Sequence, residues 1–159
     1  MTINETKPAV DRARWLEGAE FADAFCIVVD DDPIDARTAA TRMFSRSPRW
    51  VEALLGLRNL LVTPLGLKTS GAGDCGALGL IGMFPVISEK PAQLVAGLDD
   101  SHLDFRVVID VTAAREGRQV TATTLVRTHN LLGRCYLTLI KPFHRLVVKA
   151  MLRQVATAA

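Results

Sequence analysis

The C-terminal segment from Leu131 to Ala156 constrains the fold most, because it has the pattern of one long amphipathic helix. Apolar residues recur in it at the spacing of a broad helix face. They are Leu132, Cys135, Tyr136, Leu139, Ile140, Phe143, Leu146, Val147, Ala150 and Met151. The opposite face carries Lys141, Arg145, Lys149 and Arg153, and Pro142 predicts a kink. So wide an apolar face must be buried, and only the strand-rich segment before it is large enough to cover it.

That strand-rich segment begins at Met83, where the apolar period changes to two. Four runs follow, at residues 83–90, 93–100, 102–115 and 118–130. Short turn signals separate them, so neighbouring strands should pair antiparallel. In the third run one face should pack inward and the other should contact water. The inward set is Leu103, Phe105, Val107, Ile109 and Val111, and the outward polar set is His102, Asp104, Arg106 and Asp110.

The first part of the chain predicts one strand and two helices. Residues 21–30 are rich in β-branched and aromatic side chains, which favour a strand. Asp32 and Pro33 suit the N-cap and first position of a helix, and Asp35 adds negative charge to its first turn. Ser47 and Pro48 repeat this start signal for a second helix. Residues 1–20 are polar, and we expect them to be irregular and to lie across the body.

This order of elements predicts one α+β domain over residues 21–159, because the strands cluster apart from the helices. The expected architecture is an antiparallel curved sheet that grips the long C-terminal helix, with two short helices after the first strand. A chain of 159 residues is long enough to bury a substantial core in one domain.

The charged residues are unevenly placed, since no Asp or Glu follows Glu116. One interpretation is a cationic surface for anionic lipid or nucleic acid. The other is an intramolecular arrangement of a basic helix near an acidic sheet, which we favour because charge runs usually form solvated faces. Aromatic residues do not alternate with the basic ones, so we expect no nucleic-acid partner.

Several classes of site and location are disfavoured. The three cysteines form no CxxC pair, which argues against a disulfide framework or a metal site. The N-terminus lacks the apolar core of a signal peptide, and no apolar run reaches the length of a membrane span. We therefore expect a cytoplasmic protein without integral membrane contact.

A glycine-rich stretch, Gly71 to Gly76, matches the string GxGxxG. That string indicates dinucleotide binding only between a strand and a helix, whereas here a predicted helix precedes it. We expect a mobile loop that holds no nucleotide, and no cofactor elsewhere.

Local motifs resemble one family. They are WVEALLGLRNLLVTPLGL at residues 50–67, HLDFR at 102–106, and Gly133-Arg134-x-Tyr136 followed by Pro142-Phe143-His144. These resemble the DUF2867 family, which implies a fold but no established activity. The order of elements also resembles the helix-grip architecture of the START and Bet v 1-like (SRPBCC) superfamily. That resemblance implies an apolar ligand held between the sheet and the C-terminal helix.

We accordingly expect a small-molecule-binding module rather than an enzyme, and we assign no catalytic residue. The expected pocket is lined by Phe105, Val107, Ile109, Val120, Tyr136, Leu139 and Phe143. His144, beside the proline, would be a polar anchor at its mouth, or would hydrogen-bond a carbonyl freed by the kink. One alternative is a cyclase or dehydratase that uses His144 with Tyr136. Another is a protein or membrane-surface interaction module that uses the basic helix, and a homodimer is left open.

The remaining reactive side chains have plain structural interpretations. Cys26 lies in a predicted strand and Cys135 on the apolar face of the last helix, so both are expected in the core. His102, Asp104 and Arg106 share one strand face and could form a polar constellation. We favour a structural role for them.

Overall fold

The computed structural model describes residues 1–30, 33–46, 49, 78–82, 84–99 and 101–157. Their strands form one antiparallel sheet in the order β1-β2-β7-β6-β5-β4-β3. The strands are β1 (Asn4–Thr6), β2 (Phe21–Val29), β3 (Leu80–Ile81), β4 (Phe84–Lys90), β5 (Gln93–Asp99), β6 (Leu103–Ala113) and β7 (Arg118–Thr128). The helices are α1 (Arg12–Trp15), α2 (Ala36–Ser45) and α4 (Leu131–Thr157). The predicted second helix after Ser47 and the loop from Gly71 to Gly76 lie outside the described residues.

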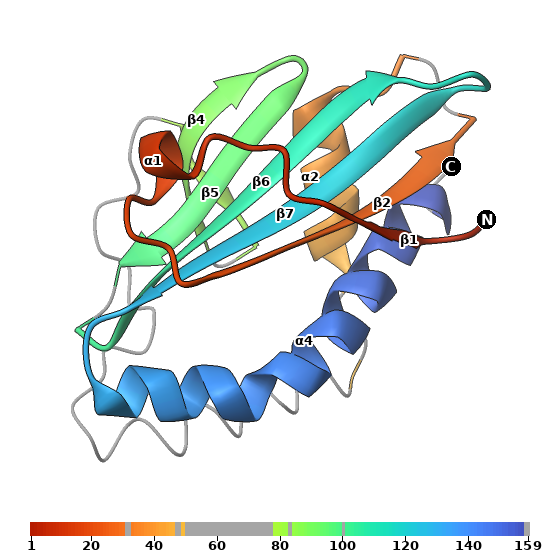
Figure 1. The fold of residues 1–159 in the computed structure, drawn as a ribbon. Coiled ribbons are helices and arrows are strands. Elements are labelled where there is room, and N and C mark those ends of the chain that lie inside the picture. The colour runs from red at the N-terminus through yellow and green to blue at the C-terminus, as the bar shows by residue number, and fades with distance from the viewer. Residues whose placement is uncertain (31–32, 47–48, 50–77, 83, 100, 158–159) are drawn as a thin grey trace.

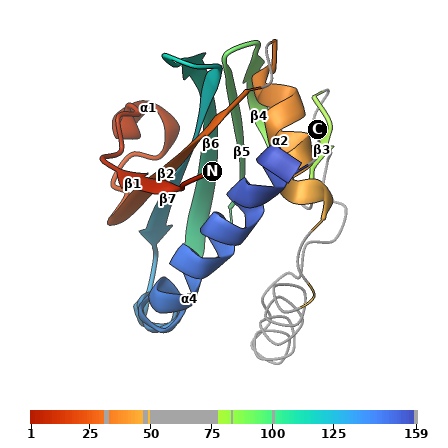
Figure 2. The same cartoon turned by 90° about the vertical axis from the view of Figure 1, so that its right-hand side faces the viewer.

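The architecture is the predicted α+β one, a curved antiparallel sheet with a long C-terminal helix. Helices α2 and α4 cover one face of the sheet, called the inner face below (Figures 1 and 2). The predicted strands at 21–30, 83–90, 93–100, 102–115 and 118–130 are all confirmed, with ends that differ by a few residues. Alternation of apolar and polar residues was a sufficient signal for them, because each strand buries one face against the helices.

The core lies between the inner face and the two helices. It contains aliphatic side chains from every long strand, with Phe25 as a fully buried aromatic residue. The helices contribute Ala36, Ala39, Ala40 and Met43 from α2, and Val148, Met151, Leu152 and Val155 from α4. The small side chains of α2 bring its backbone close to the sheet.

The predicted register of β6 is confirmed for its inward set. Val107, Ile109 and Val111 are core residues, and Phe105 packs against them. The opposite face is not fully exposed to solvent, however, because Asp104 is only 4% exposed and Val108 is fully buried. The expectation that Asp104 contacts water was therefore wrong.

The N-terminal segment explains this burial, and it is more ordered than predicted. Strand β1 pairs with β2 at the sheet edge, with Glu5 opposite Phe25. The chain then crosses the face opposite the helices, called the outer face below, where α1 lies (Figures 1 and 2). Leu16, just after α1, is buried. The prediction that residues 1–20 are irregular is corrected, while their position across the body matches the expectation.

Helix α2 begins three residues later than predicted. Its N-cap is Asp35, whose Oδ1 accepts a hydrogen bond from the Thr38 backbone N–H at 2.7 Å. Hydrogen bonds from the side chain and the backbone of Thr38 hold the pKa of Asp35 below its ordinary value. The predicted start at Pro33 is wrong because Ile34 is buried in the core before the helix begins.

Helix α4 runs through Pro142 without a break, and its axis bends along its length (Figure 1). Its buried face matches the predicted one only in part, because Met151 is buried and Val147 packs against the core as predicted. The buried residues are Gly133, Leu137, Val148, Met151, Leu152 and Val155. Leu139, Phe143 and Leu146 are exposed, and so is Cys135, which was expected in the core. Cys26 is buried as predicted. The side of α4 that packs against the sheet is therefore rotated from the predicted face towards Gly133, Leu137, Val148 and Leu152.

Candidate functional site

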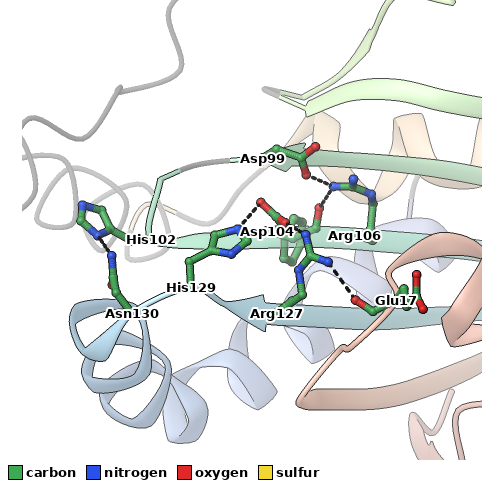
Figure 3. Close-up of polar contacts among 9 residues, drawn as sticks. Glu17, Asp99, His102, Asp104, Arg106, Arg127, His129 and Asn130 are labelled. Atoms are coloured by element: carbon green, nitrogen blue, oxygen red, sulfur yellow. Dashed lines mark hydrogen bonds and ion pairs between the residues drawn. The ribbon is translucent and has the colours of Figure 1, made fainter.

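A network of charged side chains, called the outer cluster, lies on the outer face at one end of β6 and β7 (Figure 3). Its centre is Asp104, which pairs in register with Arg127 across the two strands. Arg127 Nη2 donates to Asp104 Oδ2 at 2.6 Å, and His129 Nε2 lies 3.0 Å from Asp104 Oδ1. Arg127 Nη1 also donates to the Glu17 carbonyl at 3.0 Å. The buried carboxylate thus links β6, β7 and the N-terminal segment.

The carboxyl group of Asp104 is held in its charged form. Burial alone would raise its pKa, but hydrogen bonds from His129 and Arg127 and their charges outweigh that effect. The pKa of Asp104 is therefore lower than its ordinary value. The Nε atom of Arg127 is buried and has no hydrogen-bond partner among the described residues.

Arg106 belongs to the same face but bonds to different groups. Its Nη1 contacts Asp99 Oδ1 at 2.5 Å and donates to the Phe105 carbonyl at 2.9 Å. Gly97 lies opposite Arg106 in β5. A Cβ atom at Gly97 would lie 2.7 Å from Arg106 Cδ and 2.3 Å from the Phe105 carbonyl oxygen. Glycine at this position leaves the space that the arginine side chain occupies.

The first turn of α4 is tied to the same end of the sheet. Asn130 Oδ1 accepts from the Gly133 backbone N–H at 3.0 Å, which satisfies a donor at the helix start. The Asn130 side chain also contacts His102 Nδ1 at 2.7 Å. A Cβ atom at Gly133 would lie 2.1 Å from the His102 carbonyl oxygen. The Gly133 motif and the HLDFR motif are therefore neighbours in space, and both position α4.

A second polar pair lies on the inner face, between β2 and α4. His144 Nε2 is 3.2 Å from Asp23 Oδ1, and both side chains are mostly buried. The ring of Phe21 meets the imidazole edge-on, with 5.8 Å between the ring centroids. The other carboxylate oxygen, Asp23 Oδ2, is buried and has no partner among the described residues. The partner of His144 that the structure shows is this carboxylate, and not the freed backbone carbonyl that was one of the two predicted alternatives.

Aromatic side chains form a third feature, the aromatic cluster of Phe44, Phe84 and Phe105. The centroids of Phe44 and Phe84 are 5.9 Å apart, and those of Phe84 and Phe105 are 5.1 Å apart. All three are partly exposed on the inner face, and so are Leu98 and Leu103. Leu98 is the cross-strand partner of Phe105. Apolar surface is therefore left partly uncovered on the side of the sheet that the helices otherwise bury.

The predicted pocket residues occupy four different environments. Val107, Ile109 and Val120 are packed in the core, while Phe105 belongs to the aromatic cluster. Tyr136 is partly buried, and His144 faces Asp23. Leu139 and Phe143 are exposed on α4. The structure therefore brings the strand residues together but does not place the outward residues of α4 among them.

Sequence reasoning missed Asp23, Phe44 and Phe84. A signal for Asp23 was present in the alternation of β2, where Phe21, Phe25 and Ile27 share its inward face. A carboxylate in such a series must find a partner, because an unpaired buried charge is costly. His144 lies 121 positions away in sequence, which no local pattern can bridge.

Neither the outer cluster nor the Asp23–His144 pair has the composition of a metal centre. Within the described residues, no group of three or more His, Cys, Asp or Glu side chains is arranged to hold a metal ion. The part of the chain that the structure describes has histidine–carboxylate contacts at His129–Asp104 and His144–Asp23. Such a contact fixes the orientation of an imidazole, whose other nitrogen can then accept or donate a proton.

These features define a class of protein: an α+β domain whose sheet grips a long helix, with apolar surface and a buried acid–imidazole pair on its inner face. The chain belongs to the family described as "Protein of unknown function (DUF2867)", whose sequence profile matches residues 15–151. A search of curated proteins and a search of solved structures each found no match. None of the helices among the described residues has the length and apolar character needed to cross a bilayer.

Proposed function

We propose that this protein binds an apolar small molecule against the inner face of the sheet, beside α4. The observation that carries the proposal is the partial exposure of the aromatic cluster together with Leu98 and Leu103. Most other apolar side chains of this face are buried beneath α2 and α4. Removing apolar surface from water stabilises a complex by about 25 cal/mol per Å², so this surface favours an apolar occupant.

The position of the aromatic cluster supports the same proposal. Phe105 and Phe21 flank Val126 of β7 in register, so all three side chains lie in one row across the inner face. The resemblance to the START and Bet v 1-like architecture adds support, because members of that superfamily hold ligands between the sheet and the C-terminal helix. Ring faces and edges of this kind suit flat or chain-like apolar ligands.

Asp23 would supply a polar anchor for that ligand. It lies two residues from Phe21 on the same face of β2, and neighbouring strands are about 5 Å apart. The buried Oδ2 can accept a hydrogen bond from a ligand hydroxyl or amine, which would relieve its unpaired state. The preferred ligand is therefore apolar with one hydrogen-bond donor.

Thermal unfolding in the presence of a ligand panel tests the proposal. The panel contains fatty acids, sterols and aromatic polyketides, and a bound compound raises the melting temperature with concentration. We expect Phe105→Ala to reduce that shift. Trp15→Ala is the matched control, since Trp15 is a partly buried aromatic residue of α1 on the other side of the sheet. A panel that leaves the melting temperature unchanged, or a shift reduced equally in both variants, would contradict the proposal.

The Asp23–His144 pair favours an enzyme of the cyclase or dehydratase type as a second candidate. In that role His144 would take a proton from a bound substrate, and Asp23 would stabilise the resulting imidazolium. Mass spectrometry of each compound that shifts the melting temperature would detect a reaction product. Turnover that His144→Asn abolishes while binding persists would support catalysis, and unchanged compounds would exclude it for those ligands.

A further inference from the structure

We propose that residues 7–20, called the strap, open from the outer face as a unit while the sheet stays folded, and that the charged form of Asp104 keeps the strap closed. The strap joins β1 to β2 and crosses the outer face between them (Figures 1 and 2). The proposal concerns a movement on the side of the sheet opposite the inner face, and it does not depend on the small-molecule function.

The strap covers an apolar surface, called the outer apolar patch. The patch comes from four neighbouring strands, and its side chains are fully buried: Ala24, Val95, Val108 and Leu125. Val95 lies opposite Val108 in register, and Thr123 lies between Val108 and Ala24 in the same row. Helices α2 and α4 lie on the other face, so the described residues that cross the patch belong to the strap (Figures 1 and 2).

The strap has few contacts of its own that could hold it in place. Its helix α1 has four residues and none of them is buried. Within the strap, all of which the structure describes, Leu16 is the only buried residue, at 4% exposed. Segments with few buried apolar contacts open at a lower free energy than the domain as a whole. We therefore infer that the strap can detach without unfolding the sheet.

Polar contacts with β7 fasten the end of the strap that leads into β2. Arg127 Nη1 donates to the Glu17 carbonyl at 3.0 Å, and Thr128 Oγ1 donates to Glu20 Oε2 at 2.7 Å. The backbone N–H of Glu20 donates to the Val126 carbonyl at 2.9 Å. The strap is thus held where it meets the outer cluster.

Asp104 controls the strap through Arg127. With the strap closed, Asp104 is 4% exposed and the Nε atom of Arg127 is buried. Closing the strap therefore removes a carboxylate and a guanidinium from water together. A buried cation without a charged partner is costly, so closure is favourable while Asp104 carries its charge. The nearby carboxylate of Asp99 contacts Arg106 instead.

Opening of the strap leaves the paired strands as they are. One end of the strap continues into β1 and the other into β2, and both strands keep their pairing in the sheet. The outer apolar patch, Asp104 and Arg127 would then contact water. The strap is therefore a lid, and its position decides whether an apolar surface of the sheet is exposed.

Hydrogen–deuterium exchange of the full-length protein, measured on peptides by mass spectrometry, tests the proposal. The backbone N–H groups of Leu16 and Glu20 are hydrogen-bonded in the closed strap, so their exchange reports opening. In the unmodified protein, peptides from the strap should exchange about a hundredfold faster than peptides from β5, β6 and β7, or faster still.

Neutralising Asp104 tests the role of its charge. Asp104→Asn should speed exchange of the strap by about ten- to a hundredfold, because Arg127 is left beneath it without a charged partner. Asp99→Asn is the matched control, since Asp99 is the register partner of Asp104 but its side chain is 64% exposed. The control should exchange as the unmodified protein does. Asp104→Asn combined with Arg127→Gln should recover most of the lost protection, because neither charge is then buried.

A change in the core tests whether the strap opens independently. Leu152 is fully buried between α4 and the sheet. Leu152→Ala should speed exchange of the strands and leave exchange of the strap unchanged, because the core stays packed when the strap opens. Circular dichroism checks that each variant folds. If Asp104→Asn does not fold, Arg127→Gln removes the same ion pair and should also speed exchange of the strap.

Three results would overturn the proposal. The first is exchange of the strap at the rate of the strands, or an equal effect of Leu152→Ala on both, which would mean that the strap opens only when the domain unfolds. The second is an equal effect of Asp99→Asn and Asp104→Asn on the strap. The third is a double variant that exchanges as fast as Asp104→Asn, which would show that lost contacts, and not an unpaired charge, release the strap.

Discussion

Asp104 and Asp110 lie on the same face of β6, yet their carboxyl groups respond to burial in opposite ways. Hydrogen bonds from His129 and Arg127 overcome the effect of burial on Asp104, and its pKa is lowered. Asp110 has no cation beside it in the structure as described. Burial therefore raises its pKa, against a smaller opposing effect of the Gln93 hydrogen bond at 2.8 Å. Strand alternation placed both residues on the outer face, but it could not show that the N-terminal segment covers one of them.

Replacing Asp104 by Asn should destabilise the protein by about 1–3 kcal/mol at pH 7, because Arg127 and His129 lose a charged acceptor. The lowered pKa means that the charged form stabilises the fold above pH 4, and that this contribution is lost as pH falls through the folded-state pKa. Urea unfolding at several pH values should therefore show the difference between variant and unmodified protein shrinking below about pH 4. A difference that is constant between pH 7 and pH 3 would contradict this account. Asp99→Asn is the control, since its carboxylate is exposed and should contribute little.

Replacing Asp110 by Asn should change the stability in the opposite direction. The raised pKa means that the charged form of Asp110 is disfavoured in the folded state, so its ionisation lowers stability as pH rises. An amide keeps an oxygen that can accept from Gln93 and removes the buried charge. We expect the variant to be as stable as the unmodified protein or more stable at pH 7, by denaturant unfolding, and a clear loss of stability would show that the charge is needed.

At the scale of elements, α4 shows where sequence patterns stop being decisive. Its sequence predicted one broad apolar face, and in the structure Met151 of that face is buried whereas Leu139, Phe143 and Leu146 are exposed. The side of the helix that carries Gly133 packs against the sheet instead, because the helix backbone approaches the His102 carbonyl there. The strands were predictable because each has one apolar face, so the alternation of apolar and polar residues allows only one face to be buried.

Truncating a side chain on the buried side of α4 should cost more stability than truncating one on its exposed side. Leu152 is fully buried, so Leu152→Ala should cost about 2–5 kcal/mol in the free energy of unfolding. Leu139 is mostly exposed, and Leu139→Ala should change stability by about 0.5 kcal/mol or less. Chemical denaturation of both variants measures the comparison. Similar losses at the two positions would mean that Leu139 is packed against the protein.

At the scale of the whole molecule, the sequence was sufficient for the layers and insufficient for the contacts between distant segments. The α+β class, the antiparallel strands and the inward set of β6 follow from local periodicity. The contacts of Asp23 with His144, of Thr128 with Glu20 and of Arg127 with Glu17 join segments more than 100 positions apart. No local pattern encodes such pairs. The candidate site was therefore found only in part: Phe105 and His144 were anticipated, and their actual neighbours were not.

The proposed ligand site lies on the inner face of the sheet, whereas Leu139 and Leu146 lie on the exposed side of α4. Phe105 packs against the core on the inner face, and Leu139 is 65% exposed. A ligand that binds the inner face and a compound that only adheres to the exposed side of α4 should therefore label different peptides.

Photo-crosslinking with a diazirine-bearing fatty acid, mapped by mass spectrometry, tests the central claim most directly. The account predicts saturable labelling of the peptides that contain Phe84, Leu98 and Phe105, which unlabelled fatty acid should suppress by competition. Labelling that is confined to Leu139 and Phe143, or that no competitor reduces, would contradict a ligand site on the inner face.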